Sequence, residues 1–363
     1  MTVSTPLAVV LVPLHATPDD QPPPLTALRL LTEWSLDWWL VVGLAIPAVL
    51  YAAGLVRLRR RGDRWPVRRS VAFFAGGLGM AAIATLSGLG AYDTVLFSVH
   101  VVQHMILMMV TPMFLALGAP VTLALRTLPR HPRTVLLSVL HSRVARVLTF
   151  PPLALALFIA TPFVLYFSSF YELSLRSAFW HAFLHVHFVI IGALLMWPLT
   201  GIDPIPGRLS YPMRLLIMFL MLPFHAFLGI AIMSSSQLIA EDWYLAFNRT
   251  WAPSPLDDQY LAGAIMWGSG DITAVFVLAA LFVQWFAHSQ REARRVDRRL
   301  DRLDEQARRA KETASVSSEG GRPPLNPPKS VLSSEGGRPP LNPPKSVMGA
   351  TISPPANQET NSE

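Results

Sequence analysis

The sequence has 363 residues, of which 52% are hydrophobic and only 15% are charged. A soluble domain carries about 25% charged residues, so this composition excludes an ordinary globular surface and favours a single membrane bundle. The net charge is +7, and the absence of cysteine excludes disulfides and thiolate metal ligands. Any metal site must therefore use histidine, methionine, carboxylate or backbone ligands.

Residues 1–35 are expected to form an extracytoplasmic N-terminal segment. This segment holds a short apolar run, Pro6 to Leu14, followed by a polar, proline-rich stretch. The run is too short to cross a bilayer, which requires about 20 residues. No basic residue precedes it, so support for a cleaved signal peptide is weak.

Residues 36–287 are expected to form an all-α, polytopic integral membrane domain. Its apolar runs predict about seven transmembrane helices in one bundle. The third run contains Pro112 and Pro120, which predict a kink or break near its inner end. The expected spans are residues 36–56, 70–90, 95–125, 150–168, 178–198, 213–236 and 261–287.

Arginines alternate between the loops and predict the orientation of the bundle. They cluster at residues 57–69, 126–146 and 291–299, whereas loop 237–260 carries four acidic residues. The positive-inside rule places the N-terminus outside and the C-terminus in the cytoplasm, although the loop after the fifth span offers only Arg208 and Arg214. We interpret the arginines as topology signals and contacts to the lipid bilayer, and we expect no nucleic-acid partner.

The C-terminal region is expected to divide into two parts. Residues 288–312 are highly charged and predict a cytoplasmic helix. In residues 313–363 the segment SSEGGRPPLNPPKSV occurs twice, from Ser317 and from Ser333. Proline, glycine and serine dominate this tail, which predicts disorder.

Six of the ten histidines fall inside predicted spans, where a polar ring is costly and usually functional. Two pairs are spaced i, i+4, which places two imidazoles on one helix face about 5–6 Å apart, close enough to hold one metal ion. At 1.5 Å rise per residue, both pairs lie roughly 5–13 Å deep on the outer side. The predicted metal ligands are His100, His104, His181, His185 and His225.

His225 has a second interpretation as a helix–helix hydrogen-bond partner, because a lone intramembrane histidine is often of that kind. A further set of residues is predicted either to bind the metal directly or to form hydrogen bonds to the side chains that bind it. Imidazole together with thioether suits copper, particularly Cu(I), although core packing is the ordinary role of any single methionine. The set comprises His187, which points away from the His181 and His185 face, and Gln103, Met105, Met108, Met233, Met266 and Asp271.

Four stretches give the chain a family resemblance over about residues 35–290. They are HVVQHMILMMVTPMFLALGAPVTLAL from His100, HAFLHVHF from His181, PFHAF from Pro223 and DQYLAGAIMWGSGD from Asp258. Together they resemble the polytopic CtaG family of assembly factors for caa-type cytochrome c oxidases. The resemblance implies a bacterial plasma-membrane protein that helps a haem–copper oxidase to mature, with copper as the cofactor and oxidase subunits or copper chaperones as partners.

The leading functional hypothesis is a non-enzymatic assembly factor that binds copper at an outer-leaflet His/Met site. Two alternatives remain from the residues alone. Paired histidines also occur in membrane di-iron enzymes, although there the histidine boxes are denser and face the cytoplasm. Two histidines on different spans can also ligate haem in an electron carrier, and a Soret band in the purified protein would identify that case.

Overall fold

The computed structural model describes residues 10–11, 16–20, 22–35, 37–204 and 209–319. The chain forms two compact units, Met1–Val296 and Asp297–Glu363, and the first contains all of the predicted site residues. Most of the apolar run Pro6–Leu14 and the tail beyond residue 319 lie outside the described residues. The segment predicted to be a charged cytoplasmic helix, residues 288–312, is helical within a longer helix that runs to Glu319.

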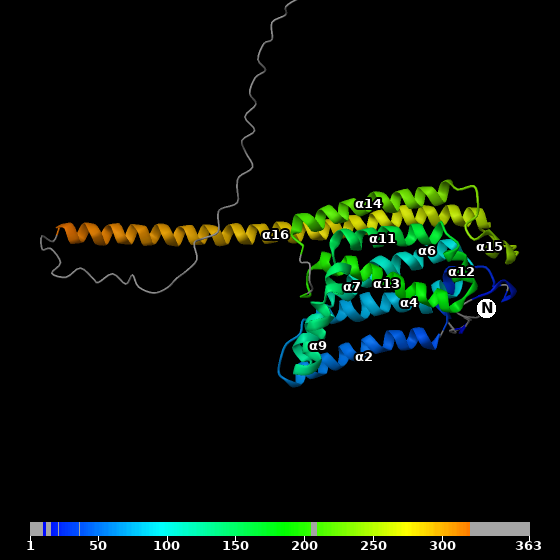
Figure 1. Ribbon diagram of the computed structural model, residues 1–363, viewed down its shortest axis with the longest axis horizontal. Helices are drawn as coiled ribbons and strands as arrows, with labels where there is room; N and C mark the ends of the chain where they lie inside the picture. The colour runs from blue at the N-terminus through cyan, green and yellow to red at the C-terminus, as the bar shows by residue number, and fades with distance from the viewer. Residues whose placement is uncertain (1–9, 12–15, 21, 36, 205–208, 320–363) are drawn as a thin grey trace, which may run out of the picture. The chain divides into compact units, whose positions relative to one another are not determined.

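Helices make up nearly all of the regular structure among the described residues (Figure 1). The first half of the chain contains α1 (Ala27–Thr32), α2 (Trp38–Arg60), α3 (Val67–Val71), the π-helix η2 (Ala72–Gly79), α4 (Met80–Leu86), α5 (Gly88–Tyr92), α6 (Phe97–Met105), the π-helix η3 (Ile106–Val110), α7 (Thr111–Leu117), α8 (Pro120–Thr127), α9 (Arg130–Leu140) and α10 (Arg143–Leu148). The second half contains α11 (Pro151–Tyr166), α12 (Phe170–Arg176), α13 (Ala178–Thr200), α14 (Tyr211–Ser234), α15 (Glu241–Ala246) and α16 (Pro255–Glu319). A 3₁₀ turn, η1 (Pro18–Asp20), and a parallel two-residue pairing of β1 (Val10–Leu11) with β2 (Glu33–Trp34) complete the N-terminal segment.

Six helical stretches in the described residues are long and apolar enough to cross a membrane. They confirm the all-α class. The bounds of the first five differ by at most four residues from predicted spans, whereas the sixth begins six residues before the predicted seventh span and continues 26 residues past its predicted end at residue 287. The count of about seven is reached only if a bent helix pair is taken as one span. The six stretches are Trp38–Arg60, Val67–Leu86, Phe97–Thr127, Ala178–Thr200, Tyr211–Ser234 and Pro255–Thr313.

The bent pair occupies the position of the predicted fourth span. Helix α11 has only 16 residues, or about 24 Å, which is short for a bilayer. The chain turns by 69° before α12 begins. Ser168 lies at the turn, where its hydroxyl donates to the Val164 carbonyl and accepts from the Phe170 amide. A serine that satisfies backbone groups in this way ends one helix and starts another.

The long third span is interrupted where the prolines predicted it. Helix α7 ends at Leu117, and Ala119 adopts a left-handed conformation (φ 52°) immediately before Pro120 begins α8. Pro112 does not break the helix: it lies in the first turn of α7, and η3 leads into α7 with helical backbone at Val110. The π-helix η3 precedes it, and such wide turns are frequent at functional sites.

Helix α13 lies in the interior and carries two of the predicted ligands. It packs against α7, η3, α11 and α12. A side chain at Gly192 would collide with the carbonyl of Met108, so this glycine allows α13 and η3 to approach backbone to backbone. The close approach turns one face of α13 toward α6 and η3, which hold the other histidine pair.

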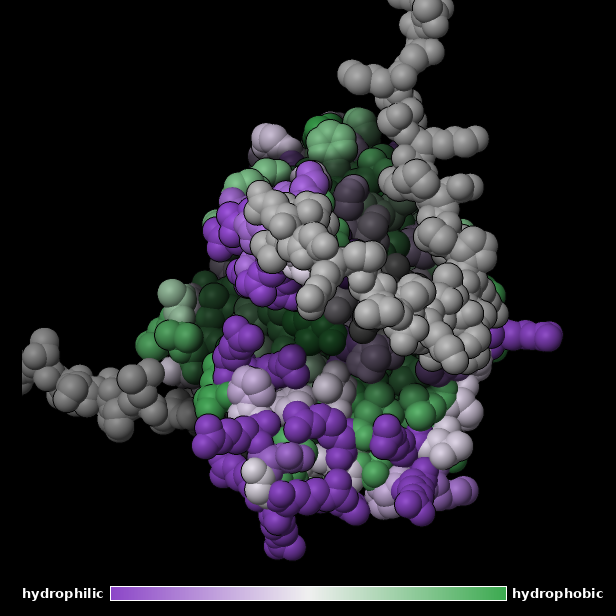
Figure 2. Space-filling model, turned by 90° about the vertical axis from the view of Figure 1, so that its left-hand side faces the viewer, coloured by the Kyte–Doolittle hydropathy of each residue, from purple (hydrophilic) through white to green (hydrophobic). Residues whose placement is uncertain are grey.

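Basic side chains gather at one end of the first unit. Figure 2 shows hydrophilic residues over the lower part of this face, at the end where Figure 1 places α9. Arg61 donates to the carbonyl of Arg126 across 3.0 Å, and Arg126 pairs with Asp63 at 3.5 Å. The two basic loops therefore meet at the same end of the bundle, as the charge pattern predicted.

Candidate metal centre

Asp93 occupies the connection between α5 and α6, which is fixed by side chains of α15 and α16. The indole of Trp243 donates to the carbonyl of Thr94 across 2.8 Å. The carboxylate of Asp258 accepts from the amide of Phe97 at 2.7 Å and thereby caps the start of α6. Asp93 itself is fully buried. This connection therefore presents a carboxylate to the interior at a defined position.

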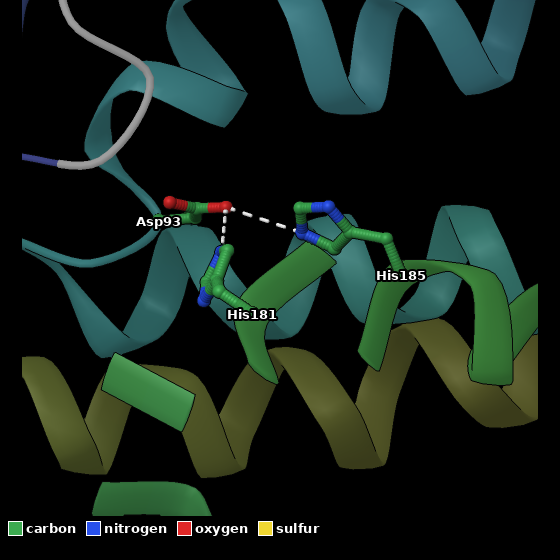
Figure 3. Close-up of side chains that lie close together, drawn as sticks. All are labelled: Asp93, His181 and His185. Atoms are coloured by element: carbon green, nitrogen blue, oxygen red, sulfur yellow. Dashed lines mark hydrogen bonds and ion pairs between the residues drawn. The ribbon is translucent and has the colours of Figure 1, made fainter. Parts of the chain in front are cut away.

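His181 and His185 lie one turn apart on α13 and both face Asp93 (Figure 3). The Nε2 atom of His181 is 2.8 Å from Oδ2 of Asp93, and Nε2 of His185 is 3.5 Å from the same oxygen. One ligand atom from each residue fits within 4.8 Å, which is compatible with a shared metal ion. We call these three residues the Asp93 cluster.

Gln103 joins two members of the Asp93 cluster. Its amide nitrogen donates to Asp93 Oδ2 at 2.6 Å and to the carbonyl of Ala84 at 3.0 Å. Both amide hydrogens are then used, so Oε1 accepts from Nε2 of His185 at 2.8 Å. This hydrogen-bond pattern assigns the proton of His185 to Nε2 and leaves the lone pair on Nδ1. That Nδ1 atom is buried and has no hydrogen-bond partner among the described residues.

Asp93 lies in the loop between two spans, and its charge depends on the histidines that face it from α13. Burial by itself would raise the pKa of the carboxyl group. The hydrogen bond from His181 and the nearby ring of His185 outweigh burial and hold the pKa below its ordinary value. The group is therefore ionised at neutral pH, and its Oδ1 atom makes no hydrogen bond with the described residues. The carboxylate of Asp93 is therefore a buried negative charge that can bind a cation.

His100 borders the Asp93 cluster from α6. Its ring lies 6.2 Å from that of His181 and 4.9 Å from that of Tyr171, measured between centroids. The side chain is completely buried, and neither ring nitrogen has a hydrogen-bond partner among the described residues. An unpaired buried nitrogen costs about 1–3 kcal/mol. Such a cost is expected where a site is built to receive a ligand.

The other two predicted ligands, His104 and His225, lie outside the Asp93 cluster. The ring of His104 stacks on Phe188 of α13, with centroids 4.3 Å apart and planes inclined by 11°. His225 on α14 packs beside Phe158, and its Nε2 atom is buried without a partner among the described residues. Three of the five imidazoles therefore lie at or beside the Asp93 cluster, His104 stacks on Phe188, and His225 packs beside Phe158.

The additional predicted residues are scattered. His187 points elsewhere, as expected, and its Nε2 atom lies 3.3 Å from the Thr161 hydroxyl. Gln103 supports the Asp93 cluster, and Met108 contacts His104. Four others have no hydrogen bond or ion pair to the cluster among the described residues: Met105, Met233, Met266 and Asp271.

Sequence reasoning missed Asp93, although a signal was present. Between Arg69 and Arg126 it is the only acidic or basic residue apart from histidine. A single carboxylate in so long an uncharged stretch is costly to bury unless it is paired. The loop position, seven residues before His100, hid its relation to histidines on a different helix.

Comparison with known proteins places the chain in a family. The model of the cytochrome c oxidase caa3 assembly factor family matches residues 49–288. The chain is 42% identical over 289 residues to an uncharacterized protein of Mycobacterium bovis and 37% identical over 287 residues to one of Mycobacterium leprae. Each alignment covers 77% of this chain but 43% of the relative, so the chain spans less than half the length of these relatives. No solved structure matches it.

Proposed function

The chain belongs to the cytochrome c oxidase caa3 assembly factor family, and we propose that it aids oxidase maturation by binding copper at the Asp93 cluster and passing it to a partner. The observation that carries this proposal is the convergence of one buried carboxylate and two buried imidazoles beside the unpaired ring of His100. Copper is the cargo in this account, and the protein acts as a carrier rather than an enzyme.

The donor set of the Asp93 cluster fits copper. Two imidazoles and a carboxylate suit divalent copper, whereas magnesium and calcium prefer oxygen ligands throughout. The carboxylate offsets part of the ion's charge in a buried site. Gln103 orients both Asp93 and His185, as groups behind metal ligands commonly do. His100 supplies a further imidazole at the edge of the cluster.

The alternatives gain less support from this arrangement. A bis-histidine haem requires a flat space between two imidazoles on facing helices. The space between His104 and α13 is filled by the stacked ring of Phe188, and the ring of His100 packs against Tyr171, with centroids 4.9 Å apart. A membrane di-iron enzyme would need denser histidine boxes, whereas the Asp93 cluster contains two histidines. Copper carriage therefore remains the preferred function.

The partners and location follow from the family. The proposed recipients or donors of copper are subunits of the oxidase and copper chaperones, and the proposed location is the bacterial plasma membrane with several helices crossing it. The N-terminus would lie outside and the C-terminus in the cytoplasm. The Asp93 cluster would then open toward the outer leaflet, because α6 and α13 both begin at that end.

Topology reporters test the orientation. A reporter fused after residue 310 is expected to show cytoplasmic activity, because the arginine-rich loops lie at the end of the bundle that should face the cytoplasm. A reporter inserted beside Asp257 should show extracytoplasmic activity. The reverse pattern would place the Asp93 cluster at the cytoplasmic end and remove its proposed access from outside.

Complementation tests the function. In cells that lack the gene, His181→Ala/His185→Ala is expected to leave the oxidase without its copper, because the cluster loses both imidazoles. Asp93 keeps its hydrogen bond from Gln103, and the amount of the variant in the membrane is measured alongside. Assembled oxidase should be measured by its haem spectrum and copper content, and excess copper should restore part of it. His187→Ala is the matched control on the same helix and should behave as wild type. Full oxidase assembly by the double variant would refute the proposal.

A further inference from the structure

His104 and Met108 form a second pair of metal-binding groups, away from the Asp93 cluster. They lie one turn apart, on α6 and on the π-helix η3, and both side chains are completely buried. The Nε2 atom of His104 is 3.1 Å from the Sδ atom of Met108. An imidazole nitrogen and a thioether sulfur, both good ligands for soft metals, therefore converge on one point. We call these two residues the His104 pair.

The surroundings of His104 fix the direction of its ring. Its Nδ1 atom lies 2.9 Å from the hydroxyl of Tyr166, and Phe188 stacks on its face. When Nδ1 carries the proton and donates to Tyr166, the lone pair of Nε2 points at the sulfur. In metal sites, a ligating histidine commonly donates its other ring N–H to a nearby acceptor, and this hydrogen bond aims the ligating nitrogen at the metal. Tyr166 thus has the position of an orienting group.

The His104 pair lacks the carboxylate that characterises the Asp93 cluster. None of the described hydrogen bonds or ion pairs joins His104 or Met108 to an acidic residue. Neutral ligands in apolar surroundings favour a monovalent ion, because a divalent charge would be buried without an opposite charge.

We propose that the His104 pair is a separate site for monovalent copper. The site would take Cu(I) or its analogue Ag(I), since thioether sulfur prefers soft ions. This inference deepens the proposed function, on which it rests for the identity of the metal as copper. The bundle would then hold two sites of different character: an oxygen- and nitrogen-donor site at Asp93 and a nitrogen- and sulfur-donor site at Met108.

X-ray absorption of the full-length protein loaded with one equivalent of Ag(I) tests the second site. The spectrum is expected to contain a sulfur shell from Met108. Met108→Leu should remove this shell and weaken Ag(I) binding about 10- to 100-fold. Met109→Leu is the matched control, because Met109 is also buried on η3 but has no hydrogen bond to an imidazole among the described residues.

A second variant separates this inference from the proposed function. His181→Ala/His185→Ala is expected to retain the sulfur shell and Ag(I) affinity, because it removes only the Asp93 cluster. A wild-type spectrum without sulfur, or one that Met108→Leu leaves unchanged, would show that the His104 pair is a hydrogen bond within the core and overturn the inference. Loss of the sulfur shell in the double variant would show one shared site and would equally overturn it.

Discussion

Asp93→Leu is expected to reduce the free energy of unfolding by about 3–5 kcal/mol and to abolish copper binding at the Asp93 cluster. The carboxylate accepts from His181 and Gln103 and lies beside His185, all inside a buried region. Leucine fills the space but leaves these donors without an acceptor, which is more costly than losing the bond alone. Thermal unfolding in detergent and the yield of folded protein measure the loss.

Asp93→Asn separates the fold from the metal site. Asparagine keeps the shape and one acceptor oxygen, so the protein should fold with a smaller loss of stability than the leucine variant. It removes the negative charge, and copper affinity is therefore expected to fall about 10- to 100-fold. Wild-type stability of Asp93→Leu would show that the carboxylate has no structural role, and wild-type affinity of Asp93→Asn would show that it is not a copper ligand.

His185→Ala is expected to abolish stoichiometric copper binding while leaving the protein folded. The substitution removes one of the two imidazoles of the Asp93 cluster and the acceptor–donor link to Gln103. A remaining imidazole and one carboxylate are too few to hold copper against a competing chelator. Competition titration measures the change, and we expect a weakening of about 100-fold. Asp93 keeps its hydrogen bonds with His181 and Gln103, so protein abundance should stay close to wild type.

His187→Ala is the appropriate comparison for His185→Ala. The two histidines are two residues apart on α13, but His187 contacts Thr161 and is partly exposed. Its removal should leave copper affinity unchanged. If both substitutions reduced copper affinity equally, α13 would tolerate no change in this turn. The loss at His185 would then not identify it as a copper ligand.

The sequence predicted the helices because long apolar runs and alternating arginines are local signals. The sequence did not predict the turns at which a single polar side chain ends a helix. Ser168 ends α11 early, and nothing in the apolar run of residues 150–168 distinguishes this serine from one that is tolerated within a span. The short pairing of β1 with β2 likewise depends on two segments more than 20 residues apart.

The candidate site was predictable in its residue types but not in its grouping. The i, i+4 spacing placed His181 with His185 and His100 with His104 on shared helix faces. Whether the two histidine pairs form one site depends on the side chains packed between the helices. Phe188 on α13 stacks on His104 and occupies the space where a histidine of α13 would have to lie. Asp93 lies in a loop, where no periodicity indicates its direction. Its role emerged only from the packing of that loop against α13.

Electron paramagnetic resonance of the purified protein loaded with one equivalent of Cu(II) tests the central claim most directly. The account predicts stoichiometric bound copper whose spectrum shows coupling to imidazole nitrogens, and loss of both the copper and the coupling in His181→Ala/His185→Ala. The His104 pair should not replace this signal, because its neutral ligands favour a monovalent ion. Copper that remains bound with an unchanged spectrum in the double variant would contradict the assignment of the Asp93 cluster as the copper site.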